Sequence, residues 1–153
     1  DEIDAIRYYQ EAGFGIAQPI GFITNDKWGF TLGYSPDALV GDDGLIEVKG
    51  RRQKYQAETI IKGEMPNEFS IQVQTGLLVS ERKWCDFISF CGGMPMAVMR
   101  ILPDERVQDA IIKAATIFHG WVYTMLEEYR LQMERDVIRL VPTERRVEEE
   151  ITL

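Results

Sequence analysis

Histidine and cysteine, which most often serve as general bases, nucleophiles or zinc ligands, are scarce in this sequence. The 153 residues include one histidine, His119, and two cysteines, Cys85 and Cys91. His119 lies in an amphipathic stretch, where we expect a packed or surface residue. The cysteines flank an apolar, strand-like segment with no second cysteine pair nearby, so we expect free thiols. This scarcity argues against a zinc site and against a Ser-His-Asp or Cys-His nucleophilic mechanism.

Long apolar runs are also missing. No stretch reaches membrane-spanning length, and residues 1–10 are charged and helical in pattern, unlike a secretory signal. We expect a soluble protein of a reducing compartment, the cytoplasm. The length and the 45% apolar content suit one domain with a sizeable core.

Positive charge is in short supply. Lys and Arg number 17 against 25 Asp and Glu, which gives a net charge of -8. Tight, nonspecific nucleic-acid binding needs concentrated cations, so a simple protein of that class is disfavoured, although an enzyme is not. The most basic stretch, residues 50–69, carries Arg51, Arg52 and Lys54. We interpret these three as candidate DNA phosphate contacts, the alternative being an ordinary solvated loop.

Two carboxylates and an ammonium group face each other across a predicted β-hairpin. Asp37 precedes, and Glu47 and Lys49 follow, the turn-forming residues 41–44. A three-residue loop that ends with a left-handed Gly44 would place Asp37 opposite Lys49 and diagonal to Glu47. Side chains alternate along a strand, so Glu47 and Lys49 share one face of the hairpin.

The chemistry of this group suits a divalent cation. Two oxygen ligands without a neighbouring histidine favour Mg²⁺ or Mn²⁺. Lys49 could hold a water or a phosphate oxygen and stabilise developing negative charge, as phosphodiester hydrolysis requires. The alternative is a surface hairpin with a solvated salt bridge, which is nearly neutral in energy. The spacing alone does not decide between them.

The rest of the chain predicts alternating helices and strands. The first residues have the pattern of the middle of a helix, so we expect part of the protein to precede residue 1. Strand-like runs follow at 15–23 and 27–34, joined by a turn at 24–26. A helix from about residue 69 to Ser80 has Gln72 and Gln74 as polar positions, and each would serve the site or satisfy a backbone group.

Further strands are expected at 84–90 and 96–101, followed by a helix of roughly thirty residues from Pro103. We interpret the apolar stripe of this helix as core packing: Val107, Ile111, Ala114, Phe118, Trp121 and Met125. The order predicts an α/β or α+β fold with a mixed central sheet flanked by helices. One domain would span residues 1–136, with 137–153 as a tail or an oligomer contact.

These residues resemble a known family. The string SPDALVGDDGLIEVKG, followed by FSIQVQTGLLV, is similar to the lambda-type phage exonucleases, also called YqaJ-type viral recombinases, of the PD-(D/E)xK nuclease superfamily. The resemblance covers residues 2–90 and implies a restriction-endonuclease-like core. Phe69 stands where the family often has tyrosine, and the family's N-terminal helices, which help to bind the 5′ end of DNA, have no counterpart here.

The resemblance also implies roles for single residues. Asp37 and Glu47 match the family's metal-binding carboxylates, with the Val48 carbonyl as a further ligand. Lys49 matches the catalytic lysine that positions and activates the attacking water, and the catalytic set includes a glutamine, here Gln72. Glu2 resembles an acidic residue that the family's preceding helix adds to the metal cluster.

The implied activity is an exonuclease that uses Mg²⁺, with Mn²⁺ as a possible substitute and two ions in the site. Such enzymes degrade one strand of linear duplex DNA from its 5′ end and leave 3′ single strands for recombination by an annealing protein. They are typically trimeric rings, and a phage-encoded member would act in the cytoplasm of its bacterial host. In such a ring we expect Arg51, Arg52 and Lys54 to face the channel.

Two rival functions stay open. The first is another nuclease of the superfamily, either a repair or CRISPR-associated exonuclease or an endonuclease. Those exonucleases often carry an iron-sulfur cysteine set, for which two cysteines are too few. The second is a catalytically inert DNA-binding module, against which the intact catalytic set argues.

Overall fold

The computed structural model describes residues 1–135 and 138–144. The chain divides into two compact units, Asp1–Thr116 and Ile117–Leu153. Helix α4 begins in the first unit and continues into the second. The elements are, in chain order, α1 (Glu2–Glu11), β1 (Ala17–Gln18), β2 (Ile23–Asn25), β3 (Leu32–Tyr34), β4 (Ala38–Val40), β5 (Gly44–Gly50), α2 (Gln53–Lys62), a 3₁₀ turn (Asn67–Phe69), α3 (Ser70–Ser80), β6 (Trp84–Phe90), β7 (Ala97–Ile101) and α4 (Glu105–Glu134).

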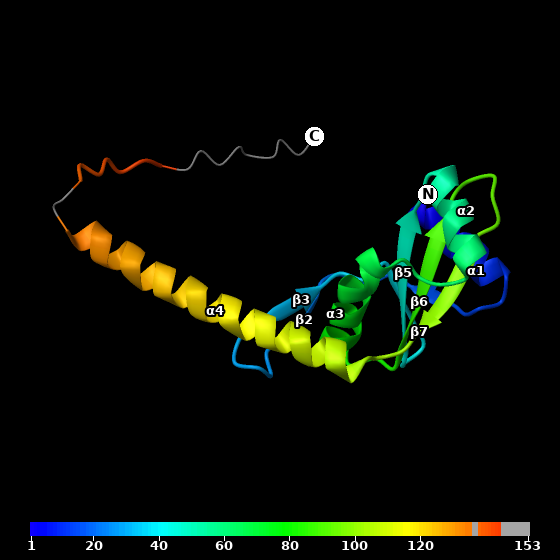
Figure 1. Cartoon of the computed structure of the whole chain (residues 1–153), viewed down its shortest axis with the longest axis horizontal. Coiled ribbons are helices and arrows are strands. Elements are labelled where there is room, and N and C mark those ends of the chain that lie inside the picture. Colours follow the sequence, from blue (N-terminus) through cyan, green and yellow to red (C-terminus); the bar gives the residue numbers. More distant parts are fainter. Residues whose placement is uncertain (136–137, 145–153) are drawn as a thin grey trace, which may run out of the picture. The chain divides into compact units, whose positions relative to one another are not determined.

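A five-stranded mixed sheet forms the centre of the first unit (Figure 1). Its strand order is β1-β4-β5-β6-β7, in which β5 and β6 are parallel and every other neighbouring pair is antiparallel. Strands β2 and β3 form a separate antiparallel hairpin. The α+β fold with a mixed sheet flanked by helices, as predicted, is confirmed.

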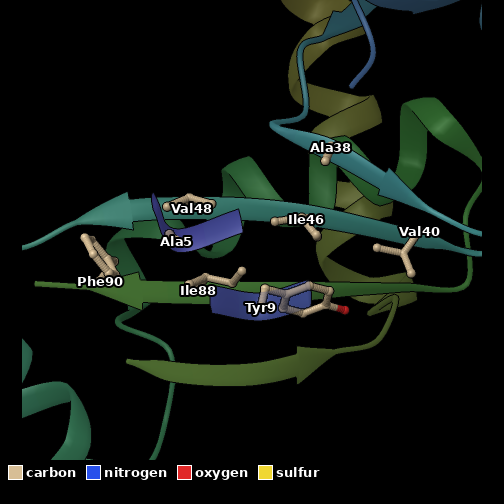
Figure 2. Close-up of a cluster of buried hydrophobic side chains, with 8 residues drawn as sticks. All are labelled: Ala5, Tyr9, Ala38, Val40, Ile46, Val48, Ile88 and Phe90. Carbon is tan, nitrogen blue, oxygen red and sulfur yellow. The ribbon is translucent and has the colours of Figure 1, made fainter. Parts of the chain in front are cut away.

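The two faces of the sheet carry different helices. Ile46 and Ile88 point to one face, where they pack with Ala5 and Tyr9 of α1 (Figure 2). Leu45, Phe87 and their neighbours point to the other face and pack with α3 and with the end of β3. Because strand side chains alternate, Glu47 and Lys49 lie on this second face, the one that α3 covers.

The hairpin register differs from the prediction by two residues. Val40 pairs with Gly44, and Asp37 donates its backbone N–H to the Ile46 carbonyl at 3.2 Å, so Asp37 lies opposite Glu47 rather than Lys49. The left-handed glycine is Gly41, with φ of 54°, and not Gly44.

Gly44 is the first residue of β5 and pairs with Trp84 of β6. The Trp84 ring covers Gly44, where a Cβ would lie only 2.1 Å from a ring atom, so a larger residue would not fit at this strand position. A slide by two residues keeps every side chain on its original face. The predicted carboxylate pair therefore survives the correction.

Other elements follow the sequence to different degrees. The helices and strands predicted at 1–10, 69–80, 84–90 and 96–101 are confirmed. The long strands predicted at 15–23 and 27–34 are wrong. Three short strands form instead, and the turn falls at residues 26–31, where the Asn25 side chain accepts the Lys27 N–H at 3.2 Å.

The basic stretch after β5, for which no helix was predicted, contains α2. Its buried residues, Gln56 and Thr59, are polar, so it shows no apolar periodicity.

Helix α4 has the predicted length of 30 residues. Its apolar stripe does not form core packing, because no α4 residue is buried and Trp121 and Met125 are 66% and 68% exposed. In the part of the chain that the structure describes, no helix is both long and apolar enough to cross a membrane. The domain boundary expected at residue 136 and most of the expected tail lie outside the described residues.

The two cysteines are free thiols, as predicted. Cys85 is buried on the α3 side of the sheet, and Cys91 is half-buried in the turn after β6. Burial raises the pKa of the Cys85 thiol, which keeps this group protonated.

Candidate active site

Side chains from three parts of the fold converge beside β5. Glu47 and Lys49 come from β5, Asp37 lies immediately before β4, and Gln72 comes from the first turn of α3. The hairpin register brings Asp37 opposite Glu47, and the packing of α3 on this face brings Gln72 to them. The structure therefore brings together the four side chains that the sequence predicts as catalytic.

Glu47 is the centre of the group. Its side chain is only 3% exposed, and its Oε1 accepts a hydrogen bond from Lys49 Nζ at 2.7 Å and one from Gln72 Nε2 at 2.5 Å. Its other oxygen, Oε2, accepts a hydrogen bond from the Tyr34 hydroxyl. Burial of a carboxylate has a large desolvation cost, and hydrogen-bond donors such as these offset it.

Asp37 is half-buried beside this group. Its Oδ2 accepts the backbone N–H of Val48 at 2.5 Å, which fixes the side chain against β5. Burial, and then the negative charges of Glu47 and Glu2, raise the pKa of Asp37 to about 6, although the Val48 N–H acts in the opposite direction. A carboxyl group whose pKa is raised by a neighbouring carboxylate lies in a site that a cation would stabilise.

The donor set is made only of oxygen, which suits a hard divalent cation. Asp37, Glu47 and the Val48 carbonyl are the groups available to hold it. Within residues 1–135 and 138–144, no three His, Cys, Asp or Glu side chains lie close enough together to bind a metal by themselves. The fit therefore depends on two carboxylates with a backbone carbonyl.

Glu2 does not join this ligand-sized group. It is exposed at the start of α1, the helix that packs on the opposite face of the sheet from Glu47. The start of α1 reaches the end of β5, since the Asp1 carboxylate lies 3.8 Å from the Cβ position of Gly50. Glu2 is thus near enough to raise the pKa of Asp37. Its predicted role as a metal ligand stays a prediction.

The two glutamines of α3 have separate roles. Gln72 donates to Glu47, as described. Gln74 donates to the Leu102 carbonyl at 2.9 Å and accepts the Asp104 N–H at 2.8 Å, so it joins α3 to the segment that begins α4. Of the two possibilities that the sequence left open, Gln72 faces the site and Gln74 satisfies backbone groups.

The predicted DNA contacts differ in their surroundings. Arg51 is largely buried: its guanidinium lies over the rings of Tyr55 and Phe69 and pairs with Glu68 at 2.7 Å. Arg52 and Lys54 are exposed at the start of α2. Both residues follow the end of β5, close in sequence to Lys49, so a DNA backbone at the site could reach them.

Tyr34 is the site residue that the sequence did not predict. It ends β3, in a hairpin that no local sequence pattern places near Glu47. Burial, and then the charge of Glu47, raise the pKa of the Tyr34 hydroxyl far above its usual range, so it remains a hydrogen-bond donor. The available signal was Gly76, a small residue within an apolar helix, and it accommodates the Tyr34 ring.

Comparison with solved structures shows that this chain is similar to an alkaline exonuclease, of which two crystal structures are described here. One is an alkaline exonuclease, LHK-Exo, from Laribacter hongkongensis: it is 31% identical, has a TM-score of 0.79, and the similarity covers 86% of this chain and 70% of that chain. The other is LHK-Exo in complex with dAMP, with the same identity and TM-score and coverage of 86% and 69%. No protein-family model matches the chain, and no curated protein matches it. The structural similarity extends over most of both chains.

Proposed function

This chain belongs to the nuclease family of the alkaline exonuclease LHK-Exo, and we propose that it is a metal-dependent exonuclease that degrades linear double-stranded DNA. The observation that carries the proposal is the convergence of Lys49 and Gln72 on Glu47 beside Asp37. The alternative, a solvated salt bridge on a surface hairpin, would not require a buried carboxylate or a glutamine from another element.

The proposed cofactor is Mg²⁺, with Mn²⁺ as a possible substitute and two ions in the complete site. When bound, the cations supply positive charge for the attacking water and for the leaving 3′ oxygen. Asp37, Glu47 and the Val48 carbonyl would hold them, and Glu2 would add a carboxylate from α1.

The protein's own groups would complete the chemistry. The Lys49 side chain lies at the edge of the site, 24% exposed, and it would donate to a water or a phosphate oxygen as negative charge develops. The ring of Phe69 lies 5.5 Å from Lys49 Nζ and limits where the ammonium can move. Gln72 would hold the orientation of Glu47, or of the water, through its amide.

We further propose 5′-to-3′ polarity, which would leave 3′ single-stranded tails for recombination by an annealing protein. The proposed surroundings are the cytoplasm, that of a bacterial host if the chain is phage-encoded. The proposed contacts to the DNA backbone are the exposed Arg52 and Lys54, together with the largely buried Arg51.

A homo-oligomer, a trimeric ring in the family pattern, is part of the same proposal. It is supported by the large apolar side chains that α4 leaves exposed, which on a monomer would be costly to keep in water. Sedimentation velocity at micromolar concentration tests this point. A single species of monomer mass would contradict it.

A substitution at the centre of the site tests the activity. Glu47→Gln keeps the size and the acceptor oxygen of the side chain but removes its charge. We expect it to lower the degradation of linear duplex DNA in Mg²⁺ by about a hundredfold or more, with unchanged circular dichroism. Glu58→Gln, an exposed glutamate of α2, is the matched control and should retain activity.

The substrates can be chosen to separate the rival functions. Linear duplexes labelled at the 5′ or the 3′ end, with 5′-phosphate or 5′-hydroxyl, report polarity and end preference. A circular duplex reports endonuclease action, because an exonuclease leaves it intact. If Glu47→Gln degraded linear DNA at the wild-type rate, the assignment of this site would be wrong.

A further inference from the structure

The two oxygens of Glu47 are held by different kinds of partner. Oε1 accepts from Lys49 and Gln72, two long, flexible side chains at the open side of the site. Oε2 accepts from the Tyr34 hydroxyl, and both side chains of this second pair are buried. The carboxylate therefore has one adaptable oxygen and one oxygen that is fixed from within the core.

The position of Tyr34 is also held by contacts that do not involve Glu47. Its ring packs on α3 at Gly76, where a Cβ would lie 2.5 Å from two ring atoms and 2.9 Å from the hydroxyl oxygen. The hairpin that carries Tyr34 is itself tied to α3, because Asn25 Nδ2 donates to the Val79 carbonyl at 3.1 Å. The hydroxyl is thus pre-positioned by packing and imposes its geometry on the carboxylate.

We propose that Tyr34 is a positioning residue for the cation site: by holding Oε2, it fixes Glu47 so that Oε1 is the oxygen offered to a divalent cation. The inference rests on the proposed function, since it assumes that Glu47 is a cation ligand. Carboxylates that bind metals are usually oriented by such outer hydrogen bonds, and loss of one costs about 10- to 100-fold in metal affinity or activity.

A second explanation is that Tyr34 only satisfies a buried carboxylate and has no specific effect on cations. The chain offers a matched control for this explanation. Tyr9 is also fully buried and donates its hydroxyl to a buried carboxylate, Asp86 Oδ2, at 2.6 Å, on the opposite face of the sheet. Tyr34→Phe and Tyr9→Phe remove the same group from comparable surroundings, and only the first touches Glu47.

The experiment measures cation binding in the absence of DNA. Wild type, Tyr34→Phe and Tyr9→Phe are titrated with Mn²⁺, and free Mn²⁺ is followed by electron paramagnetic resonance. Melting temperatures are recorded in metal-free buffer. We expect the Kd for Mn²⁺ to rise about tenfold or more in Tyr34→Phe and to keep its wild-type value in Tyr9→Phe, while both variants melt at lower temperature.

Gly76→Ala provides a second route if Tyr34→Phe fails to fold. It keeps the tyrosine but crowds its ring, so it should also raise the Kd for Mn²⁺. An unchanged Kd in a folded Tyr34→Phe protein, or an equal rise in both tyrosine variants, would overturn the inference alone. A wild-type protein that neither binds Mn²⁺ nor degrades linear DNA would overturn the proposed function together with it.

Discussion

Asp37 is the site residue whose protonation falls within the range of ordinary buffers. Its pKa of about 6 results mainly from burial and from the neighbouring charges of Glu47 and Glu2. Protons and cations should compete for this carboxylate, because ligands bind metal only when deprotonated. Below pH 6 we expect the affinity for Mn²⁺ to fall by about tenfold for each pH unit, and above pH 7 to level off. Calorimetric titrations from pH 5 to 8 measure this.

The raised pKa of Asp37 also makes the stability of the fold depend on pH. The folded carboxyl binds its proton more tightly than the unfolded one, whose pKa is 3.8. Its contribution to the free energy of unfolding is therefore full below about pH 4 and is lost as the pH rises through 6. Asp37→Asn should remove both the fall in cation affinity and this part of the stability profile. If the variant kept both pH dependences, another group would be responsible.

The sequence predicted most, but not all, of the site at this scale. Asp37, Glu47 and Lys49 belong to one short hairpin, so strand alternation places them on one face even when the register is two residues off. Tyr34 was missed because its contact with Glu47 depends on how a second hairpin packs on α3. That packing is a long-range property, which local pattern does not encode.

At the scale of elements, the approach of β3 to α3 depends on one glycine. Alanine normally stabilises a helix by about 1 kcal/mol relative to glycine. At Gly76 the added Cβ would lie 2.5 Å from the Tyr34 ring, and such overpacking costs about 1 to 3 kcal/mol. We therefore expect Gly76→Ala to destabilise the protein, as measured by urea unfolding. Gly120→Ala, in open space on α4, is the control and should be neutral or stabilising.

Helix α1 and the strand pair β6–β7 meet at a buried carboxylate. Asp86 is 2% exposed and accepts from Tyr9 and, through both oxygens, from Arg100 at 2.9 Å. Removing the arginine would leave a buried charge with one donor. We expect Arg100→Ala to lower the free energy of unfolding by about 2 kcal/mol or more.

Arg130→Ala is the control for this substitution. Its exposed pair with Glu127 should contribute less than about 0.5 kcal/mol, because solvent screens both partners. Equal losses in the two arginine variants would mean that the burial of Asp86 does not set the cost. Chemical denaturation followed by circular dichroism provides both values under the same conditions.

Elements were predictable where their apolar pattern was complete. Strands β5 and β6 carry apolar side chains along both faces, interrupted by Glu47 and Lys49 in β5 and by Asp86 in β6, and α3 is largely apolar. Helix α2 was missed because it is held by polar contacts: Gln56 donates to the carbonyls of Ser89 and Pro95 and accepts from the Ser89 hydroxyl. A helix face that is buried through hydrogen bonds consists of polar residues, so its sequence cannot be distinguished from that of a solvent-exposed face.

For the whole molecule, the question is where an acidic protein places its few cations. If Arg52 and Lys54 contact DNA phosphates, changing both to alanine should weaken binding for every sequence. It should also reduce the slope of log K against log salt by about 2. Fluorescence anisotropy with a catalytically inactive Glu47→Gln background, at several salt concentrations, measures this slope.

Lys27→Ala with Lys83→Ala is the charge-matched control. Both lysines are exposed and pair with Glu81 and Asp43, near the start of β5 and β6 and away from Arg52. This pair should leave the slope near that of the background protein. If both pairs reduced it equally, net charge rather than position would determine DNA binding.

The exposure of α4 was beyond what sequence alone can tell. The stripe that includes Phe118 and Trp121 was predicted to pack in the core, and this prediction is wrong, since both side chains are exposed. An apolar period shows that a helix needs a covering surface but does not say whether that surface is its own core or another molecule. For the same reason the oligomeric state has to be measured.

The hydrogen bonds on Glu47 have a practical consequence for handling the protein. All three donors, Tyr34, Lys49 and Gln72, belong to the protein itself, so the fold supplies the hydrogen bonds that the buried carboxylate needs. Structural zinc domains behave differently, because chelators unfold them. For the proposed Mg²⁺ site we expect EDTA to inhibit the enzyme reversibly. Activity should stop while the chain stays folded, and added Mg²⁺ should restore cleavage without a refolding step.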